Sequence, residues 1–307
     1  GSEVFCMIKI SNSEINTFLD CPRRWYFQYY LGLSKKSDGS EQVTALTYGT
    51  RIHKALEGWY IPDESLRVNP REAIRKIYAE DEANVFAAGG DMDKYREDQK
   101  SSLFLIDYYM DKVEKEGFDL GLRYVASEQS YEAQIDDEII MRGQIDCIVE
   151  RESDGARWNI DHKTFKSVAP EIQIAHLNTQ FLGYMFLYRE NNDDYLAGSI
   201  MNIFKKVKTT RAKDIIHREY IRHTQLETDN YARRLKVIGN EILKLKNKLD
   251  DGADPTTTAY PHVTTNCSWK CPFITVCGMC DDGSDWEGML NAHFEKYDPN
   301  ARYEVLK

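Results

Sequence analysis

Long apolar runs are missing from this 307-residue sequence, as are internal repeats and low-complexity linkers. No stretch approaches the roughly 20 apolar residues that a membrane span requires, and no charged-then-apolar leader opens the chain. We therefore expect no membrane partner and a cytoplasmic location, where clustered reduced cysteines bind metal more often than they pair. Without repeats or linkers, a single domain spanning residues 1–307 is expected.

Basic residues are also fewer than acidic ones. The chain has 40 Lys and Arg against 50 Asp and Glu, a net charge of −10, which by itself argues against a nucleic-acid partner. Residues 201–250 reverse this balance, with thirteen basic residues against six acidic ones. A basic segment on an acidic chain suits a protein that holds a polyanion along one surface, although solvated helix faces have the same composition.

Apolar spacing and turn signals predict helices first, then strands, then helices again. A helix begins at the capping box of Ser11 and Glu14, with Cys21-Pro22 inside it or at a break, and two or more amphipathic helices cover residues 70–117. Three strand patterns near 124–165 form a meander, and a helix over about 171–190 leads to two more strands. The predicted fold is α/β, with a mixed central sheet flanked by helices. Its segments are an N-terminal helix (11–33), a helical insertion (61–122), a sheet core (123–223), a basic helix (224–250) and a C-terminal segment (260–307).

The hairpin that joins GQIDCIVE to NIDHKT brings charged side chains together. If its turn is centred on Asp154-Gly155, facing residue numbers sum to about 309. This register pairs Asp146 with Lys163 and Ile148 with Asp161. The two aspartates and the lysine then share one face of the sheet within about 5–8 Å.

Two carboxylates and an ammonium group on the inner part of a sheet are costly unless they are paired or bind a cation. A salt bridge between Lys163 and one aspartate is the purely structural interpretation, but it leaves the second carboxylate unexplained. The functional interpretation is a hard divalent cation, Mg²⁺ or Mn²⁺, held by aspartate oxygens. Lys163 is then left to act on a water or on a transition state.

These residues resemble a known family. GQID with Asp146, followed by IDHKT with Asp161 and Lys163, resembles the metal-binding core of the PD-(D/E)xK nuclease superfamily. His53 in GTRIHKALE resembles the first motif of its RecB-like branch. Gln180 and Tyr184 in QFLGY resemble the Q-x-x-x-Y signature of that branch.

The resemblance implies a restriction-endonuclease-like fold and a metal-dependent deoxyribonuclease, an exonuclease acting on DNA ends or single strands. It implies Asp146, Asp161 and Lys163 as catalytic residues. The implied ligands of Mg²⁺ or Mn²⁺ are His53, Asp146, Asp161 and the backbone carbonyl of His162, whose side chain should point to the opposite face. Gln180 and Tyr184 would position the DNA strand.

Four cysteines at 267, 271, 277 and 280 lie in the stretch CSWKCPFITVCGMC. They could form a zinc site by themselves, since zinc accepts four cysteines. The spacing is poor for this, because only Cys277 and Cys280 form the C-x₂-C knuckle that zinc ribbons use twice. The alternative site takes its fourth ligand from distant Cys21, in FLDCPRRWYF. Cys147 alternates away from Asp146 and is expected to be a small core residue.

The second arrangement resembles the iron-sulfur branch of the RecB-like nucleases, which includes CRISPR-associated adaptation nucleases, helicase-nuclease subunits and phage-encoded relatives. The resemblance implies a [4Fe-4S] cluster that closes the C-terminal segment onto the N-terminal helix. Its ligands would be Cys21, Cys267, Cys271 and Cys277. Cys280 is then the spare, although an exchange between Cys277 and Cys280 stays open.

Three other functions remain open at this point. A non-catalytic iron-sulfur protein that binds DNA would keep the cysteines but would not need Lys163. A zinc-binding interaction module would explain residues 267–280 alone. A nuclease that acts only with a partner complex, such as recombination or CRISPR-adaptation proteins, has the same chemistry as the preferred interpretation.

Overall fold

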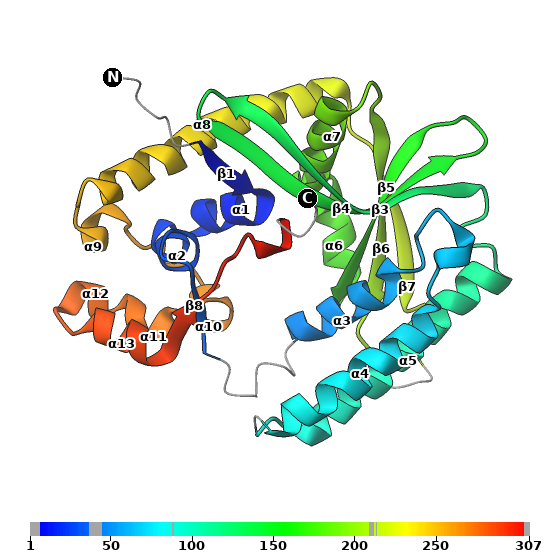
Figure 1. Cartoon of the computed structure of the whole chain (residues 1–307), viewed down its shortest axis with the longest axis horizontal. Helices are drawn as coiled ribbons and strands as arrows, with labels where there is room; N and C mark the ends of the chain where they lie inside the picture. Colours follow the sequence, from blue (N-terminus) through cyan, green and yellow to red (C-terminus); the bar gives the residue numbers. More distant parts are fainter. Residues whose placement is uncertain (1–6, 37–44, 88, 209–211, 213, 304–307) are drawn as a thin grey trace. The chain divides into compact units, whose positions relative to one another are not determined.

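The computed structural model describes residues 7–36, 45–87, 89–208, 212 and 214–303, and these fall into two compact units. The terminal unit combines residues 1–36, 132–143 and 229–307, and the central unit combines residues 37–131 and 144–228. Two long strands, β3 (Leu122–Asp136) and β4 (Ile139–Arg151), contribute to both units. Figure 1 shows the elements along the chain.

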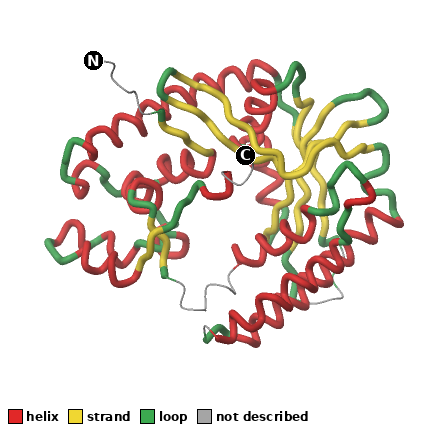
Figure 2. The backbone as a smooth tube through the Cα atoms, viewed as in Figure 1, coloured by secondary structure: helices red, strands yellow, loops and turns green. Residues whose placement is uncertain are grey.

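The central unit is built on a mixed sheet. Its strands β5 (Arg157–Phe165), β6 (Leu196–Lys205) and β7 (Ile216–Ile221) follow the β3–β4 pair in that order (Figure 2). The pairs β4–β5 and β6–β7 are antiparallel, whereas β5 and β6 are parallel. A parallel pair needs a crossover, which here consists of α6 (Ala169–Ile174), η4 (Ala175–Leu177) and α7 (Thr179–Asn191).

Each face of this sheet has its own apolar core. On one face, Trp158, Ile160 and Phe204 pack with the helices α3 (Ala45–Glu57), α4 (Pro70–Ala87) and α5 (Met92–Lys115). The turn η3 (Glu64–Leu66) lies between α3 and α4. On the other face, Met201 and Ile203 pack with α7. Strand side chains alternate between the faces with a period of two, so neighbouring positions on β5 and β6 serve different cores.

The terminal unit joins segments from both ends of the sequence. β1 (Ile8–Ser11) pairs in parallel with residues 139–142 of β4, and β2 (Leu33–Lys35) pairs antiparallel with β8 (Phe294–Lys296). Between β1 and β2 lie α1 (Asn12–Asp20), α2 (Pro22–Trp25) and the π-helix η1 (Tyr26–Tyr30). The remaining elements are α8 (Gln225–Asp250, from residue 229 on), α9 (Pro255–Thr258), α10 (Cys267–Lys270), α11 (Ile274–Cys277), α12 (Met279–Asp282), α13 (Trp286–His293) and η5 (Ala301–Tyr303).

The predicted α/β fold with a mixed sheet flanked by helices is confirmed. The capping box is confirmed as well, because the Ser11 hydroxyl accepts a hydrogen bond from the Glu14 amide at 3.3 Å. The single helix predicted over about 171–190 is wrong. Asn178 interrupts it, since its side chain accepts from the Gln180 amide at 3.0 Å and thereby caps a new helix, α7.

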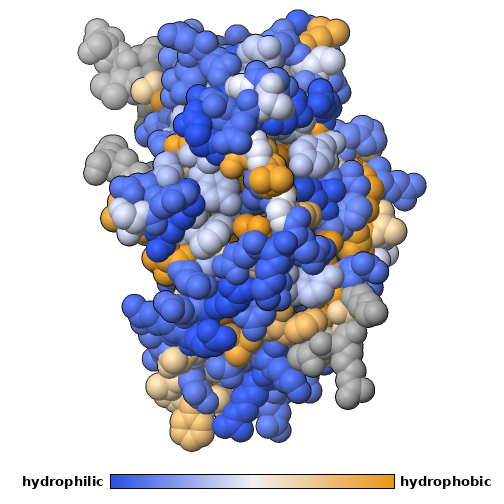
Figure 3. All heavy atoms as spheres, turned by 90° about the vertical axis from the view of Figure 1, so that its right-hand side faces the viewer, coloured by the Kyte–Doolittle hydropathy of each residue, from blue (hydrophilic) through white to orange (hydrophobic). Residues whose placement is uncertain are grey.

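Figure 3 shows a largely hydrophilic face broken by small apolar areas. Within the described ranges, no helix combines the length and the apolar character that a membrane span requires.

Candidate active site

The β4–β5 hairpin differs in register from the predicted one. Ile148 lies opposite Asn159 rather than Asp161. Facing residue numbers therefore sum to 307 instead of 309, and the predicted pairing of Asp146 with Lys163 is wrong as well.

The turn explains the difference. The Arg151 amide donates to the Ala156 carbonyl at 2.9 Å, and Gly155 adopts a positive φ of 70°, so the turn occupies residues 152–155. A register shift of two residues leaves every side chain on its own face. Continued by one position, the observed register puts Asp146 opposite Asp161.

The predicted charged cluster is present despite the new register. The Lys163 ammonium lies 3.1 Å from Asp161 Oδ1 and 3.0 Å from Oδ2, and the Asp161 side chain is 1% exposed. Asp146 Oδ2 lies 3.2 Å from His53 Nδ1, so the histidine of α3 reaches the carboxylate on β4. Helix α3 can approach because Gly49 faces β5: a Cβ there would sit 2.8 Å from the Thr164 hydroxyl.

The two carboxyl groups have opposite pKa shifts. Burial raises the pKa of Asp161, the charge of Asp146 raises it further, and Lys163 opposes both only in part. For Asp146 burial also acts upward, but the contact with His53 and the charge of Lys163 outweigh it and lower the pKa. The His53 pKa is lowered by burial and raised more strongly by Asp146, with a net rise. Two neighbouring acids of unequal strength are typical of a site that handles a proton or a cation.

Of the predicted metal ligands, the two aspartates are placed to bind a divalent cation, whereas His53 is not. Oδ2 of Asp146 and Oδ2 of Asp161 are both buried and lack a hydrogen-bond partner among the described residues, although each lies near a basic group. Two such oxygens suit Mg²⁺, which keeps several waters and needs few protein ligands. Across the described ranges no three His, Cys, Asp or Glu side chains form a ready metal-binding group. His53 is turned toward Asp146 rather than toward a shared centre.

Gln180 and Tyr184 lie directly against this cluster. The side-chain Nε2 of Gln180 donates to the Tyr184 hydroxyl at 2.5 Å, and that hydroxyl donates to Asp161 Oδ1 at 3.2 Å. Burial, together with the charges of Asp161 and Asp146, raises the pKa of Tyr184 well above its ordinary value, so the phenol stays neutral and can donate. The Asn178 cap fixes the start of the helix that carries both residues.

The His162 side chain points to the opposite face, as predicted. It is buried among aromatic rings, with the centroids of Tyr60 and Tyr109 5.2 and 6.0 Å away. Burial, with a contribution from His53, lowers its pKa to about 3, so the imidazole is neutral. Asn202 Nδ2 lies 3.4 Å from His162 Nδ1. The sequence also predicts the inward position of Cys147, which is fully buried in the same core.

Sequence reasoning missed the polar network behind His162. Arg218 donates from Nε to Asn202 Oδ1 at 2.7 Å and pairs with Asp119 at 2.7 Å, and both charged side chains are 5% exposed. The Tyr124 hydroxyl donates to the other Asp119 oxygen at 2.8 Å. An asparagine inside the apolar run GSIMNIF was the available signal, because a buried amide requires partners. Through Asn202 this network reaches the His162 side chain, between Asp161 and Lys163 in the sequence.

Two of the predicted cysteine ligands, Cys21 and Cys267, contact the same residue of the terminal unit. Cys21 Sγ accepts from the His262 amide at 3.4 Å, and Cys267 Sγ lies 3.8 Å from the His262 carbonyl. Burial raises the pKa of Cys271, and negative charge on Cys21 or Cys277 would raise it further. Cys21 and Cys267 thus contact one loop, although the described residues contain no three His, Cys, Asp or Glu side chains gathered as a metal-binding group.

Cys280 has a different environment. Its thiol lies 3.6 Å from the Val276 carbonyl, a contact within one turn of its own segment. Burial raises its pKa to about 11, and Cys277 contributes to the rise.

Arg23 ties the cysteine segment to the N-terminal helices. The guanidinium of this 2%-exposed residue makes two hydrogen bonds to Asp281, at 2.8 and 2.9 Å, and one to the Cys277 carbonyl at 2.9 Å. It also donates to the carbonyls of Thr256 and Ala259. The C-terminal segment therefore packs on the N-terminal helices, as predicted.

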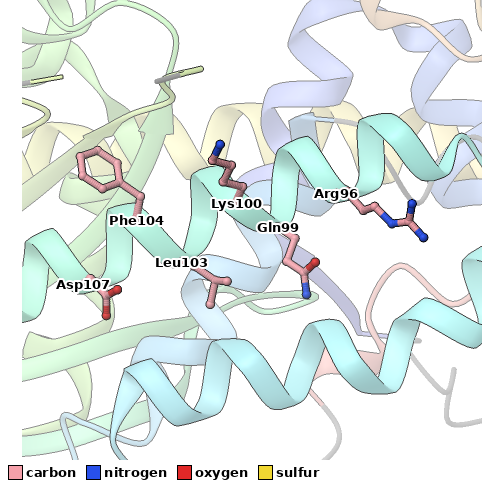
Figure 4. Close-up of a pocket in the computed structure, with 6 residues that line it drawn as sticks. All are labelled: Arg96, Gln99, Lys100, Leu103, Phe104 and Asp107. Atoms are coloured by element: carbon pink, nitrogen blue, oxygen red, sulfur yellow. The ribbon is translucent and has the colours of Figure 1, made fainter. Parts of the chain in front are cut away.

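A pocket of about 340 Å³ lies on α5, away from the predicted site residues (Figure 4). Lys100 and Phe104 point to one side of the helix, whereas Gln99 and Leu103 point to the other (Figure 4). None of its lining residues belongs to the carboxylate cluster or to the cysteine segment.

The chain is similar to known proteins in sequence and in fold. The sequence model of the PD-(D/E)XK nuclease superfamily matches residues 9–278. No curated protein matches the chain. A solved structure from Eubacterium rectale, described as "Putative exonuclease", has a TM-score of 0.52 and 11% identity, covering 88% of this chain and 87% of that one. The crystal structure of SSO0001 covers 90% and 88%, with 14% identity and a TM-score of 0.36. At such identities the first likeness concerns the fold alone, and the second supports no argument.

Proposed function

The chain belongs to the PD-(D/E)XK nuclease superfamily, and from that premise we propose that it is a divalent-metal-dependent deoxyribonuclease. We propose further that it is an exonuclease acting on DNA ends or single strands. The observation that carries the proposal is the contact chain from Gln180 through Tyr184 to Asp161, with Lys163 on the same carboxylate and Asp146 beside it.

Asp146 and Asp161 would hold the cation through their buried Oδ2 atoms, which now lie beside His53 and Lys163. The family resemblance adds the His162 carbonyl and His53 as further ligands. A divalent cation bound there neutralises charge on the scissile phosphate and lowers the pKa of the attacking water. A nitrogen ligand from His53 would favour Mn²⁺ over Mg²⁺.

Lys163 would orient the attacking water or neutralise the charge that develops on the phosphate. Its ammonium is already fixed by both oxygens of Asp161, so little reorganisation is required when charge develops. A preorganised charge of this kind contributes about 3 kcal/mol or more to the transition state. Gln180 and Tyr184 would position the strand, and their hydrogen bonds hold the Asp161 carboxylate in place.

The basic segment 201–250 would contact phosphates of the DNA backbone. On α8, Lys236 is engaged by Asp136 at 3.1 Å and Lys246 by Asp250, whereas Lys244 and Lys248 have no ion pair within the described ranges. Arg211 and Lys213 of this segment lie outside the described residues.

A [4Fe-4S] cluster on Cys21, Cys267, Cys271 and Cys277 is part of the proposal. Two observations favour this cluster. Cys21 and Cys267 contact the same residue, His262. Negative charge on Cys21 or Cys277 would raise the pKa of Cys271. Amide donors to sulfur, from His262 and Thr264, are the kind of contact that tunes such clusters. A local zinc site would instead require Cys280.

One experiment tests the enzymatic proposal. Anaerobically purified protein is incubated with end-labelled single- and double-stranded DNA, with EDTA, Mg²⁺ or Mn²⁺. We expect shortening from the ends only with a divalent cation, and Mn²⁺ at least as effective as Mg²⁺. Binding without cleavage under every condition would favour a non-catalytic or partner-dependent protein, and metal analysis showing zinc without iron would favour the interaction module.

A further inference from the structure

The carboxyl ends of β5 and β6 carry lysines outside the carboxylate cluster, and most of them belong to the basic segment 201–250. The parallel register pairs Lys163 with Ile203 and Phe165 with Lys205. Because side chains alternate along a strand, Lys205 shares its face with Lys163 and with buried Met201 and Ile203. From the usual strand spacing, the Cα atoms of Lys163 and Lys205 lie about 8 Å apart.

Lys205 is exposed and has no ion-pair or side-chain hydrogen-bond partner within the described ranges. Its backbone is fixed nonetheless, since its amide donates to the Ile215 carbonyl at 2.8 Å. The carboxylate on the same face of β7, Glu219, is engaged by His217 at 2.6 Å. The charge of Lys205 is therefore available to a ligand.

The neighbouring Lys206 differs from Lys205, because its side chain forms an ion pair. Lys206 turns to the other face, where its ammonium lies 2.6 Å from Asp98 Oδ1 and 4.1 Å from the centre of the Tyr48 ring. Its amide donates to the Phe165 carbonyl at 2.8 Å, which holds the ends of β5 and β6 together. Lys166 and Lys208 follow these two strand ends, both exposed and without an ion pair within the described ranges.

We propose that Lys205, assisted by Lys166 and Lys208, binds the DNA phosphate next to the scissile one. The inference rests on the proposed nuclease function and adds the direction in which the strand leaves the site, along the carboxyl ends of β5 and β6. Lys205 lies opposite Phe165, two positions beyond Lys163 and on the same face of the sheet. If the scissile phosphate of a DNA strand contacts Lys163, the next phosphate of that strand can therefore contact Lys205. Three free cations at one sheet edge of an acidic protein fit a polyanion.

The test combines one variant with one modified linkage. Single-stranded oligonucleotides carry a single uncharged methylphosphonate, moved one linkage at a time from each end. Binding is measured in EDTA by fluorescence anisotropy, and cleavage is measured with Mn²⁺. The parent protein should lose about tenfold in affinity when the uncharged linkage occupies the position that Lys205 contacts, and Lys205→Ala should be insensitive to the same change.

The salt dependence gives a second readout. Each lost phosphate contact on a single strand should reduce the slope of log affinity against log salt by about 0.7. Lys205→Ala should show this reduction, and the triple variant with Lys166→Ala and Lys208→Ala a larger one. Lys76→Ala, which removes a surface lysine paired with Glu80 on α4, is the matched control and should leave the slope unchanged.

Two outcomes separate the inference from the function on which it rests. If the parent protein cleaves DNA but Lys205→Ala has the parent affinity, slope and sensitivity at every linkage, the proposed phosphate site is wrong and the nuclease function stands. If the parent protein neither cleaves nor binds the oligonucleotides, the proposed function itself fails.

Discussion

Both units bury acidic side chains, but they surround them differently. In the central unit Asp161 is held by an ammonium, with a second carboxylate and a histidine beside it. In the terminal unit Glu14 is 7% exposed and accepts a hydrogen bond from the Trp25 indole at 3.0 Å, with the charge of Arg142 nearby. Burial alone therefore does not identify a catalytic acid. The central acids are marked by a second carboxylate and by ion pairs with Lys163 and His53, whereas Glu14 accepts from a neutral indole and feels the charge of Arg142.

Removing a central acid should have the largest effect. We expect Asp161→Ala to lower the cleavage rate by more than about 1,000-fold, equivalent to about 4 kcal/mol, because it removes a proposed cation ligand and the partner of Lys163. DNA affinity should stay close to that of the parent. Steady-state cleavage and anisotropy measure the two quantities, and near-parental turnover would remove Asp161 from the site.

Removing Cys21, a ligand of the proposed cluster, should affect the terminal unit. Cys21→Ala should lose the broad absorbance near ~400 nm that is expected of a [4Fe-4S] cluster. It should also lower the free energy of unfolding by about 3–4 kcal/mol, because the cluster ties segments some 250 residues apart.

Cys280→Ala is the matched control, since the thiol of Cys280 lies against the Val276 carbonyl of its own turn. It should keep both the absorbance and the stability. The reverse pattern, with zinc in the metal analysis, would show that the four C-terminal cysteines form a local site.

The pH dependence of stability tests whether Glu14 is protonated in the folded protein. Burial raises the pKa of Glu14 from 4.5 to about 7 in the folded protein, against the lowering influence of Trp25. Its contribution to stability is therefore complete below pH 4.5 and is lost as the pH rises through about 7, by up to about 3 kcal/mol. Glu14→Gln should match the parent near pH 5 and exceed it near pH 8 in urea unfolding.

The exposed Glu295 of β8 supplies the control for this pH effect. Glu295→Gln should change stability equally little at both pH values. A Glu14→Gln variant that is no more stable than the parent at pH 8 would mean that Glu14 is ionised in the folded protein.

Tyr184 should give the smallest of these effects. Tyr184→Phe removes the hydroxyl that links Gln180 to Asp161, so we expect about a tenfold loss in cleavage rate, or ~1.4 kcal/mol. Gln180→Ala should produce a similar loss, and the double variant should lose less than the two separate losses combined. Fully additive losses would show that the two residues act independently.

Alternation and capping made much of this molecule predictable. The shared face of Asp146, Asp161 and Lys163 survived a wrong register because the error was an even number of residues. The turn itself was not predictable, since the left-handed conformation of Gly155 fits either centre. The interruption by Asn178 was missed because apolar spacing continues across it, although its capping side chain was visible in the sequence.

Long-range partners were the least predictable part. Arg218 with Asp119, and Arg23 with Asp281, join residues about 100 and 258 positions apart, and no local pattern specifies such pairs. The sequence indicated where a buried amide or cation would need a partner, but only the fold determines which residue provides it.

The central claim is that Lys163 and its neighbouring carboxylates form a hydrolytic centre that works with a divalent cation. The most direct test compares the parent with Lys163→Ala in Mn²⁺ binding, DNA binding and cleavage of an end-labelled strand. We predict that both proteins bind Mn²⁺ and DNA, and that the variant cleaves more than about 100-fold more slowly. Cleavage by Lys163→Ala at the parental rate, or cleavage by the parent in EDTA, would contradict the account.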